Sequence, residues 1–179
     1  MSPKSKIQNP KSKIENLAII ALGSNLGDSR TSLLRAMERL QTLSDQPVLK
    51  SSFFETAPVD CPPGSPPFIN AVVALHPRQA ETPESLLGKL QMIEKEFGRQ
   101  PKKLLNEPRP LDLDLIAFGS ARRSTNRRTL PHPRAHLRRF VLEPLAEIAP
   151  GLILPGQRKN VGQLLFSLLK RSEFSKLRG

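Results

Sequence analysis

Cysteine is nearly absent from this sequence, and long apolar runs are absent altogether. Cys61 is the single cysteine, so the chain has no pair with which to form an internal disulfide. No apolar stretch reaches the roughly 18 residues that a membrane-spanning helix needs. The basic amino terminus also lacks the apolar core of a secretory signal. We therefore expect a soluble, cytoplasmic protein with no membrane partner.

Two signatures of phosphate and RNA binding are also missing. The stretch ALGSNLGD, residues 21–28, contains glycines but lacks the G-x-x-x-x-G-K-[ST] spacing of a Walker loop. The sequence contains no K/R-G-F/Y-G/A-F-V-x-F/Y motif, which RNA-binding sheets of the ferredoxin type carry on their central strands. Any phosphate or RNA binding must therefore use other residues.

Acidic residues are few, and one stretch has none. Lys and Arg number 28 against 16 Asp and Glu, a formal net charge of +12. Such a charge favours a polyanionic partner, which could be a nucleic acid, a nucleotide or an acidic membrane surface. The acid-free stretch runs from Leu115 to Leu142 and contains Arg122, Arg123, Arg127, Arg128, Arg134, Arg138, Arg139, His132 and His136. A solvated basic loop explains this stretch equally well before any motif is considered.

The amino-terminal segment differs in composition from the rest of the chain. It contains the near-repeat KSKIQNP and KSKIENL, which is too short and too polar to bury a core. We expect residues 1–16 to be a disordered basic extension. The length suits one domain, which we place at residues 17–179.

Apolar periodicity predicts alternating strands and helices. The strands are predicted at residues 17–22, 48–59, 68–76 and 111–118. The helices are predicted at residues 28–43 and 82–98, with Thr82 and Pro83 suited to a helix start and Gly98 to a helix end. Residues 57–67 are proline-rich and predict a loop, whereas residues 141–150 and 161–170 predict short helices that close the core. The order β-α-β, β-α-β predicts an α+β ferredoxin-like sandwich with a mostly antiparallel sheet of four or more strands.

The segment LDLDL, residues 111–115, places two carboxylates in an apolar strand. Strict alternation puts its three leucines on one face and Asp112 and Asp114 on the other. Residues two apart along a strand are about 6.5–7 Å apart, a gap that suits two carboxylates reaching toward hard cations. The alternative is a surface strand with one solvated polar face, although neighbouring like charges repel in that setting.

Basic residues flank this carboxylate pair. Arg109 lies between Pro108 and Pro110, which restrict its backbone, and a rigidly presented guanidinium suits a phosphate. Further cations are available from Arg99, Lys102, Lys103, His132 and Arg138. Magnesium with several arginines and no obvious nucleophile indicates phosphoryl-type transfer, in which the protein mainly positions groups and stabilises charge.

Five segments between Ala21 and Pro150 occur in a recognisable order. They read ALGSNLGD, ETAPVDCPPGSPPFINAVVAL, IEKEFGR, PRPLDLDLIAFG and LPHPRAHLRRFVLEPLAEIAP. In this order they resemble the 6-hydroxymethyl-7,8-dihydropterin pyrophosphokinase family. The resemblance implies a ferredoxin-like α+β protein of folate biosynthesis. It implies transfer of the β,γ-diphosphate of ATP to the hydroxymethyl group of a reduced pterin, which leaves AMP, with two Mg²⁺ ions.

The resemblance also assigns roles to individual residues. It implies that Asp112 and Asp114 are the magnesium ligands and that both, with Arg99 and Arg109, are catalytic. The implied ATP-binding residues are Gln91, Glu94, Arg99, Arg109, Leu115, His132 and Arg138. For the pterin it implies stacking by Phe68 and Phe140 and a pocket lined by Thr56, Pro58, Val59 and Asn70. For an arbitrary phenylalanine, core packing is the commoner role.

The loop before Arg109 departs from the family pattern. The atypical residues are Pro101, Leu105, Asn106 and Glu107, and they affect the expected nucleotide affinity and loop motion more than the chemistry. Three hypotheses follow. The first is a monomeric magnesium-dependent enzyme acting on two small molecules without a nucleic-acid partner. The second is a basic ferredoxin-like RNA-binding module, and the third is the same fold without activity.

Overall fold

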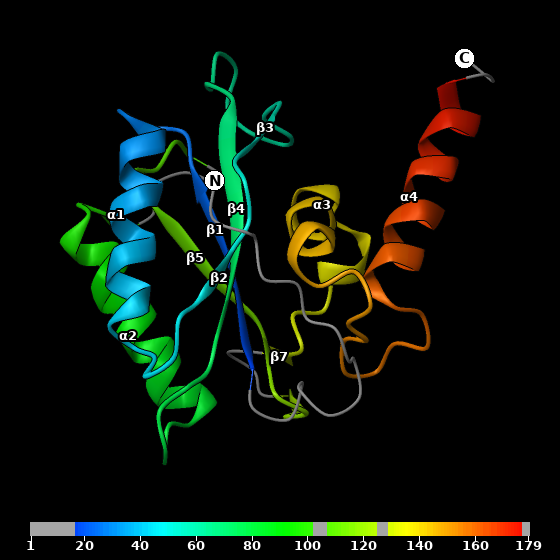
Figure 1. The fold of residues 1–179 in the computed structure, drawn as a ribbon. Helices are drawn as coiled ribbons and strands as arrows, with labels where there is room; N and C mark the ends of the chain where they lie inside the picture. The colour runs from blue at the N-terminus through cyan, green and yellow to red at the C-terminus, as the bar shows by residue number, and fades with distance from the viewer. Residues whose placement is uncertain (1–16, 102–106, 125–128, 177–179) are drawn as a thin grey trace, which may run out of the picture.

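The computed structural model describes residues 17–101, 107–124 and 129–176, and Figure 1 traces their fold. The predicted amino-terminal extension lies outside the described residues. The elements in chain order are β1 (Ala18–Ser24), α1 (Ser29–Gln41), β2 (Leu49–Lys50), β3 (Phe54–Thr56), β4 (Phe68–Leu75), α2 (Pro83–Glu96), β5 (Asp112–Phe118), β6 (Arg123–Ser124), β7 (Thr129–Leu130), the 3-10 helix η2 (Ala135–Leu137), α3 (Arg139–Ile148) and α4 (Val161–Lys176).

The main sheet has the strand order β2-β4-β1-β5, and β3 continues the β2 side by pairing with β4. Every pairing is antiparallel, and β1 lies between β4 and β5. Two β-α-β units are therefore interleaved, each with a strand of the other between its own two strands. The predicted ferredoxin-like α+β fold is confirmed.

The second predicted strand, residues 48–59, is divided into the two short strands β2 and β3. Ser51 causes the interruption, because its Oγ accepts a hydrogen bond from the Val72 backbone N–H at 2.9 Å. The Ser51 N–H in turn donates to the Val72 carbonyl at 3.0 Å. A side chain thus replaces one backbone acceptor of the ladder, and regular pairing resumes only at Phe54.

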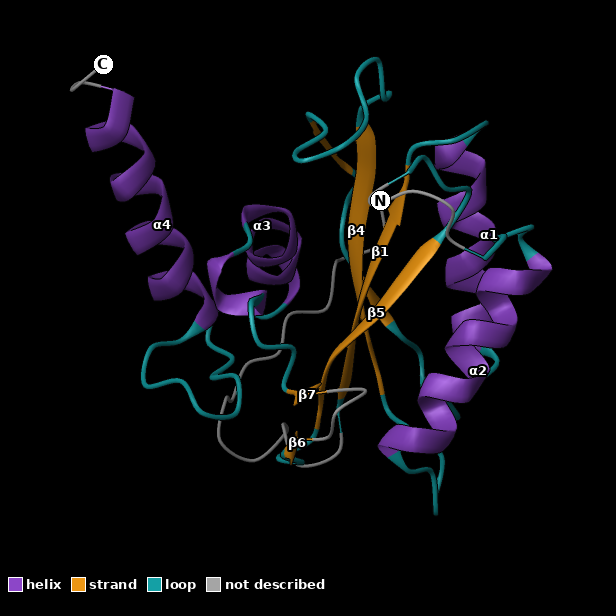
Figure 2. Cartoon of the chain, turned by 180° about the vertical axis from the view of Figure 1, so that it is seen from behind, coloured by secondary structure: helices purple, strands orange, loops and turns teal. Residues whose placement is uncertain are grey.

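Helices cover both faces of the sheet (Figure 2). Helices α1 and α2 bury Leu33, Leu40, Leu86 and other apolar side chains against one face. Helix α3 packs against the opposite face, and α4 packs on α3. The carboxy-terminal helices therefore build a second apolar core, and α4 with its 16 residues is longer than the predicted segment 161–170. None of the helices in the described part of the chain is long and apolar enough to cross a membrane.

Two caps define where the helices on the first face begin. The Asp28 side chain accepts from the Thr31 backbone N–H at the start of α1. At the start of α2 the Thr82 and Ser85 side chains and backbone bond reciprocally, and Pro83 occupies the first turn. Both predicted helix starts are confirmed. They place the amino end of α1 beside the carboxyl end of β1.

Strand β5 forms one edge of the sheet. Its buried Leu113 and Leu115 belong to the core beneath α1 and α2, as the alternation predicts. Asp112 and Asp114 are half-buried on the other face, beside the exposed edge. A small hairpin of β6 and β7, which the sequence analysis did not predict, then returns the chain to this strand. The His132 backbone N–H consequently donates to the Ile116 carbonyl at 2.8 Å.

Candidate active site

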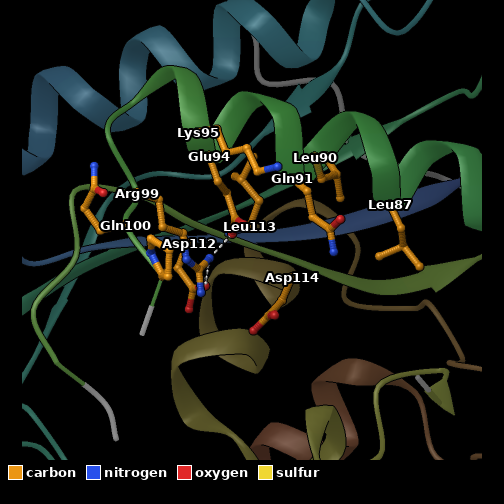
Figure 3. Close-up of a pocket in the computed structure, with 11 residues that line it drawn as sticks. Leu87, Leu90, Gln91, Glu94, Lys95, Arg99, Gln100, Asp112, Leu113 and Asp114 are labelled. Carbon is orange, nitrogen blue, oxygen red and sulfur yellow. Dashed lines mark hydrogen bonds and ion pairs between the residues drawn. The ribbon is translucent and has the colours of Figure 1, made fainter. Parts of the chain in front are cut away.

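A cleft of about 450 Å³ opens between helix α2 and the edge strand β5 (Figure 3). Its lining combines apolar residues of α2 with charged residues of both elements and of the loop after α2. These residues are Leu87, Leu90, Gln91, Glu94, Lys95, Arg99, Gln100, Pro101, Asp112, Leu113 and Asp114. The cleft therefore has an apolar end along α2 and a charged end at the beginning of β5.

Asp112 lies between two guanidinium groups. Arg99 Nη1 is 2.7 Å from Asp112 Oδ1, and Arg109 Nε is 3.3 Å from Asp112 Oδ2. All three side chains are about one-fifth exposed. Arginine charge thus compensates this carboxylate, and the predicted phosphate-binding arginines meet at it.

Asp114 has weaker compensation. Its nearest ion-pair partner is Arg138, whose Nη1 lies 4.0 Å from Asp114 Oδ2, and 42% of the Asp114 side chain is exposed. Partial burial, followed by the negative charge of Asp112, raises the pKa of Asp114. A cation bound near both carboxylates would offset this repulsion.

The two carboxylates suit a magnesium ion that also contacts phosphate. Among the described residues, no group of three His, Cys, Asp or Glu side chains is placed to enclose a metal. Mg²⁺ commonly binds one or two carboxylates and fills its remaining positions with substrate phosphates and water. Asp112 and Asp114 therefore fit magnesium shared with a nucleotide better than a metal held by protein alone.

Glu94 connects helix α2 to the strand that carries the carboxylates. Its Oε1 accepts the Leu113 backbone N–H at 2.7 Å and also pairs with Arg99 Nη1. Burial raises the pKa of Glu94, and the Leu113 N–H and the Arg99 charge oppose that effect. The sequence analysis predicted a nucleotide contact here. In the structure the Glu94 side chain bonds to protein groups, whereas Gln91 lies one turn earlier along the lining of the cleft.

His132 is held in its neutral form by its surroundings. Its Nδ1 accepts the Arg134 backbone N–H at 3.2 Å, which leaves Nε2 to carry the proton. Burial and then the positive charge of Arg138 lower the pKa of His132, although Asp114 acts in the opposite direction. A neutral imidazole beside Asp114 and Arg138 can donate one hydrogen bond to a phosphate oxygen.

Three of the predicted pterin residues, Thr56, Phe68 and Asn70, lie on β3 and β4, which are on the other side of β1 from β5. Asn70 donates from Nδ2 to Thr56 Oγ1 at 2.8 Å. The Phe68 ring lies under Arg109, with 5.5 Å from the guanidinium carbon to the ring centroid. Phe140 lies under Arg138 at 5.4 Å in the same way. Each predicted stacking ring is therefore paired with one of the predicted phosphate-binding arginines.

Gly23 lies on β1, between Asp112 on β5 and the predicted pterin residue Asn70 on β4. It is opposite Asp112 on β5 and opposite Asn70 on β4. Directly opposite residues of antiparallel strands point to the same face, so these two side chains flank a position without a side chain. A β-carbon at Gly23 would lie 3.4 Å from Asn70 Oδ1 and 3.8 Å from Phe68 Cδ1. The missing side chain leaves room between the carboxylates and the predicted pterin pocket.

Two predicted contacts are placed less favourably, Leu115 and Val59. Leu115 is only 4% exposed and packs in the core, so its side chain is not available to ATP and only its backbone could contact a nucleotide. Val59 is 74% exposed on the proline-rich loop, next to the half-buried Pro58. Lys102, Lys103, Leu105 and Asn106 lie outside the described residues.

The sequence analysis missed two residues of the site, Gly23 and Asn25. Both belong to ALGSNLGD, which was used only for the resemblance and to exclude a Walker loop. Asn25 is 2% exposed and bonds to the backbone of Arg109. The signal available in the sequence was a polar residue with two flanking glycines directly after a buried strand.

Comparison of the sequence with known proteins points to one family. The sequence model of the 7,8-dihydro-6-hydroxymethylpterin-pyrophosphokinase family matches residues 19–150. A 2-amino-4-hydroxy-6-hydroxymethyldihydropteridine pyrophosphokinase of Synechocystis is 38% identical over 148 residues, which cover 83% of this chain and 74% of that protein. The protein of the same name from Haemophilus influenzae is 37% identical over 155 residues, covering 86% and 91%.

A solved structure with the same fold belongs to a longer protein. The wild-type HPPK-DHPS of Plasmodium falciparum with pteroate superposes with a TM-score of 0.70 at 12% identity. The match covers 87% of this chain and 45% of that one, so the chain spans less than half of that protein. At this identity the superposition supports the fold, whereas the sequence matches carry the assignment. The chain belongs to the 7,8-dihydro-6-hydroxymethylpterin-pyrophosphokinase family.

Proposed function

We propose that this chain transfers a diphosphate group from ATP to the hydroxymethyl group of 6-hydroxymethyl-7,8-dihydropterin, at the cleft beside β5. The observation that carries the proposal is the pair Asp112 and Asp114 on one face of an edge strand, with three arginines around it. The products are AMP and the pterin diphosphate, and the reaction belongs to folate biosynthesis.

The nucleotide occupies the cleft under α2. Its base and ribose lie toward the apolar end at Leu87 and Leu90, near Gln91, and its phosphates lie toward the charged end. Arg99, Arg109, His132 and Arg138 contact the phosphate oxygens. These cations stabilise negative charge that spreads over the transferred group in the transition state. Their placement on four different segments encloses the phosphates from several sides.

Asp112 and Asp114 are the residues that would hold magnesium at the charged end of the cleft. Two bound Mg²⁺ ions would supply charge neutralisation and Lewis-acid polarisation at the phosphates. The carboxylates supply ligands at two positions about 6.5–7 Å apart along the strand. Because Arg99 and Arg109 already contact Asp112, that carboxylate must exchange part of its arginine contact for the ion.

The pterin occupies the region around Phe68, Asn70, Thr56 and Phe140. The two aromatic rings stack on the flat bicycle, and the Asn70 amide and Thr56 hydroxyl offer donors and acceptors to its edge. In this orientation the hydroxymethyl oxygen attacks the β-phosphorus of ATP and releases its proton to water. The bond from that phosphorus to the α,β-bridging oxygen breaks, and AMP leaves with that oxygen. The Arg109 guanidinium lies over the Phe68 ring and pairs with Asp112, so it can remain in contact with the diphosphate group during transfer.

Isosteric substitutions test the proposal. Asp112→Asn and Asp114→Asn should each lower Mg²⁺-dependent release of AMP from ATP and the hydroxymethyl pterin by about a hundredfold or more. Asp45→Asn, an exposed aspartate paired with Arg78, is the matched control and should retain wild-type turnover. Wild-type turnover by both site variants would contradict the assigned role, and so would unchanged turnover in a chelator.

The family match gives no support to the RNA-binding hypothesis, and the same protein preparations test it directly. Saturable binding of a non-hydrolysable ATP analogue at moderate salt, with Mg²⁺, supports the enzyme. RNA binding that disappears steeply with salt, without nucleotide binding, would support the basic module instead. We propose a cytoplasmic monomer that acts on two small molecules. Light scattering tests the oligomeric state, because it measures the mass of the protein in solution.

A further inference from the structure

Asn25 is a buried polar residue in the turn between β1 and α1. It is 2% exposed although it lies outside regular structure. A buried amide side chain loses its bonds to water and needs protein partners for both its carbonyl and its amino group. Its partners therefore reveal which segments it joins.

Two of its hydrogen bonds go to the backbone of Arg109. The Asn25 N–H donates to the Arg109 carbonyl at 3.2 Å, and Asn25 Oδ1 accepts the Arg109 N–H at 3.0 Å. A third bond leads to a different loop, because Asn25 Nδ2 donates to the Pro66 carbonyl at 3.2 Å. A single residue thus connects the arginine loop before β5 with the proline-rich loop before β4.

Both partners lie beside residues of the proposed chemistry. Pro66 is two residues before Phe68, the ring at the start of β4. Arg109 extends its guanidinium over that ring and toward Asp112. The position of the arginine over the ring therefore depends on two backbone segments that Asn25 joins.

The Arg109 side chain contacts Asp112 and the Phe68 ring, but within the described part of the chain its Nε makes no hydrogen bond that would fix its direction. Its Nε is buried and has no partner with hydrogen-bond geometry among the described residues, although Asp112 Oδ2 lies 3.3 Å away. Pro108 and Pro110 on either side cannot donate backbone hydrogen bonds. The Asn25 contacts are consequently the main hydrogen-bonded restraint on the Arg109 backbone.

We propose that Asn25 is a positioning residue. It holds the Arg109 backbone so that the guanidinium meets the transferred phosphate, and it holds Pro66 so that Phe68 stays in register with that arginine. This inference rests on the proposed diphosphate transfer. Asn25 acts through Arg109 and Phe68 and touches neither substrate.

Two substitutions separate the two links. Asn25→Asp keeps an oxygen that accepts the Arg109 N–H but replaces the donor to Pro66. It should raise the KM for the pterin about tenfold and leave kcat within about threefold. Asn25→Ala removes both side-chain links and should also lower kcat about tenfold or more, while the Kd of an ATP analogue changes less than about threefold.

Ser24→Ala is the matched control in the same turn. Ser24 is fully buried, and its Oγ donates to Ser29 Oγ at 2.9 Å, so the substitution disturbs the turn without touching either loop. This variant and the wild type should turn over at similar rates. The activity of the wild type and of Ser24→Ala tests the proposed diphosphate transfer. If both were inactive, the proposed function would be wrong whatever the Asn25 variants show.

A double substitution separates positioning from a purely structural role. The quantity compared is the loss of kcat caused by Asn25→Ala with and without Arg109→Ala. If Asn25 acts on kcat through Arg109, Asn25→Ala should cost little further kcat once Arg109→Ala is present. Folded fraction is monitored for all variants by thermal unfolding. If Asn25→Ala does not fold, Asn25→Leu and Asn25→Leu/Arg109→Ala replace the alanine series, because leucine fills a similar volume and has neither the acceptor for the Arg109 N–H nor the donor to Pro66. Fully additive losses, or losses that follow the folded fraction alone, would overturn the inference.

Discussion

Arg99 Nη1 lies 2.7 Å from Asp112 Oδ1 and also pairs with Glu94, so one guanidinium joins a carboxylate of β5 to a carboxylate of α2. Asp112 is therefore neutralised by protein groups, whereas Asp114 depends on the more distant Arg138. The two acids of the LDLDL segment consequently differ in their electrostatic surroundings. This asymmetry bears on the stability of the protein and on its activity.

Glu94→Gln should weaken both the fold and the cleft. The amide oxygen can still accept the Leu113 N–H, but the charge that holds Arg99 is lost. We expect the free energy of unfolding to fall by about 1–3 kcal/mol and the KM for ATP to rise several-fold, measured by urea denaturation and by steady-state kinetics. The exposed Glu38→Gln on α1 is the control, and an equal effect of the two substitutions would contradict this role for Glu94.

Asp114→Asn should stabilise the metal-free protein although it removes a proposed magnesium ligand. A folded-state pKa raised above the ordinary 3.8 means that stability declines as the pH rises through that folded value. At neutral pH the ionised carboxylate therefore opposes folding, by less than about 1 kcal/mol because the 42% of the side chain that is exposed allows solvent screening. Urea denaturation in a chelator should show a higher midpoint for the variant. A lower midpoint would show that the Arg138 contact outweighs the repulsion.

The pKa of His132 predicts a pH dependence of stability. Its folded-state pKa lies below the ordinary 6.5, so the unfolded chain binds the proton first as the pH falls. The His132 contribution is fully present above pH 6.5 and is lost as the pH falls from there to the lowered folded value. His132→Asn should flatten this part of the curve, measured by thermal unfolding at a series of pH values. An unchanged curve for His132→Asn would contradict this contribution of His132.

Gly23→Ala should reduce pterin binding with little effect on the backbone. Its φ is not in the left-handed region, so the added methyl group strains no dihedral angle. The new β-carbon would lie 3.4 Å from Asn70 Oδ1 and 3.8 Å from Phe68 Cδ1, so the methyl group would fill the open position beside the proposed pterin pocket. We expect the KM for the pterin to rise about three- to tenfold and the Kd of an ATP analogue to stay within about twofold. Gly88→Ala, where nothing lies within 4 Å, is the control.

Much of the fold follows from patterns in the sequence. The apolar run of β1, the alternation in β5 and the caps at Asp28 and Thr82 all depend on neighbours in the chain, and the structure agrees with each. The division of the second strand was not predicted because it depends on Ser51 meeting Val72, which is 21 residues later. The hairpin of β6 and β7 has only two residues in each strand, too few for a period to be recognised.

The sequence by itself determined that Asp112 and Asp114 share a face, because the strand period of two is a local property. It also determined that arginines and aromatic residues occur in the pattern of one enzyme family. The tertiary structure decided which arginine compensates which acid, and that Glu94 bonds to Arg99 and Leu113. It also decided that Asn25 joins Arg109 to Pro66 across 84 and 41 residues of chain. Such contacts form between elements that only the packing of helices on the sheet brings together, so no local period encodes them.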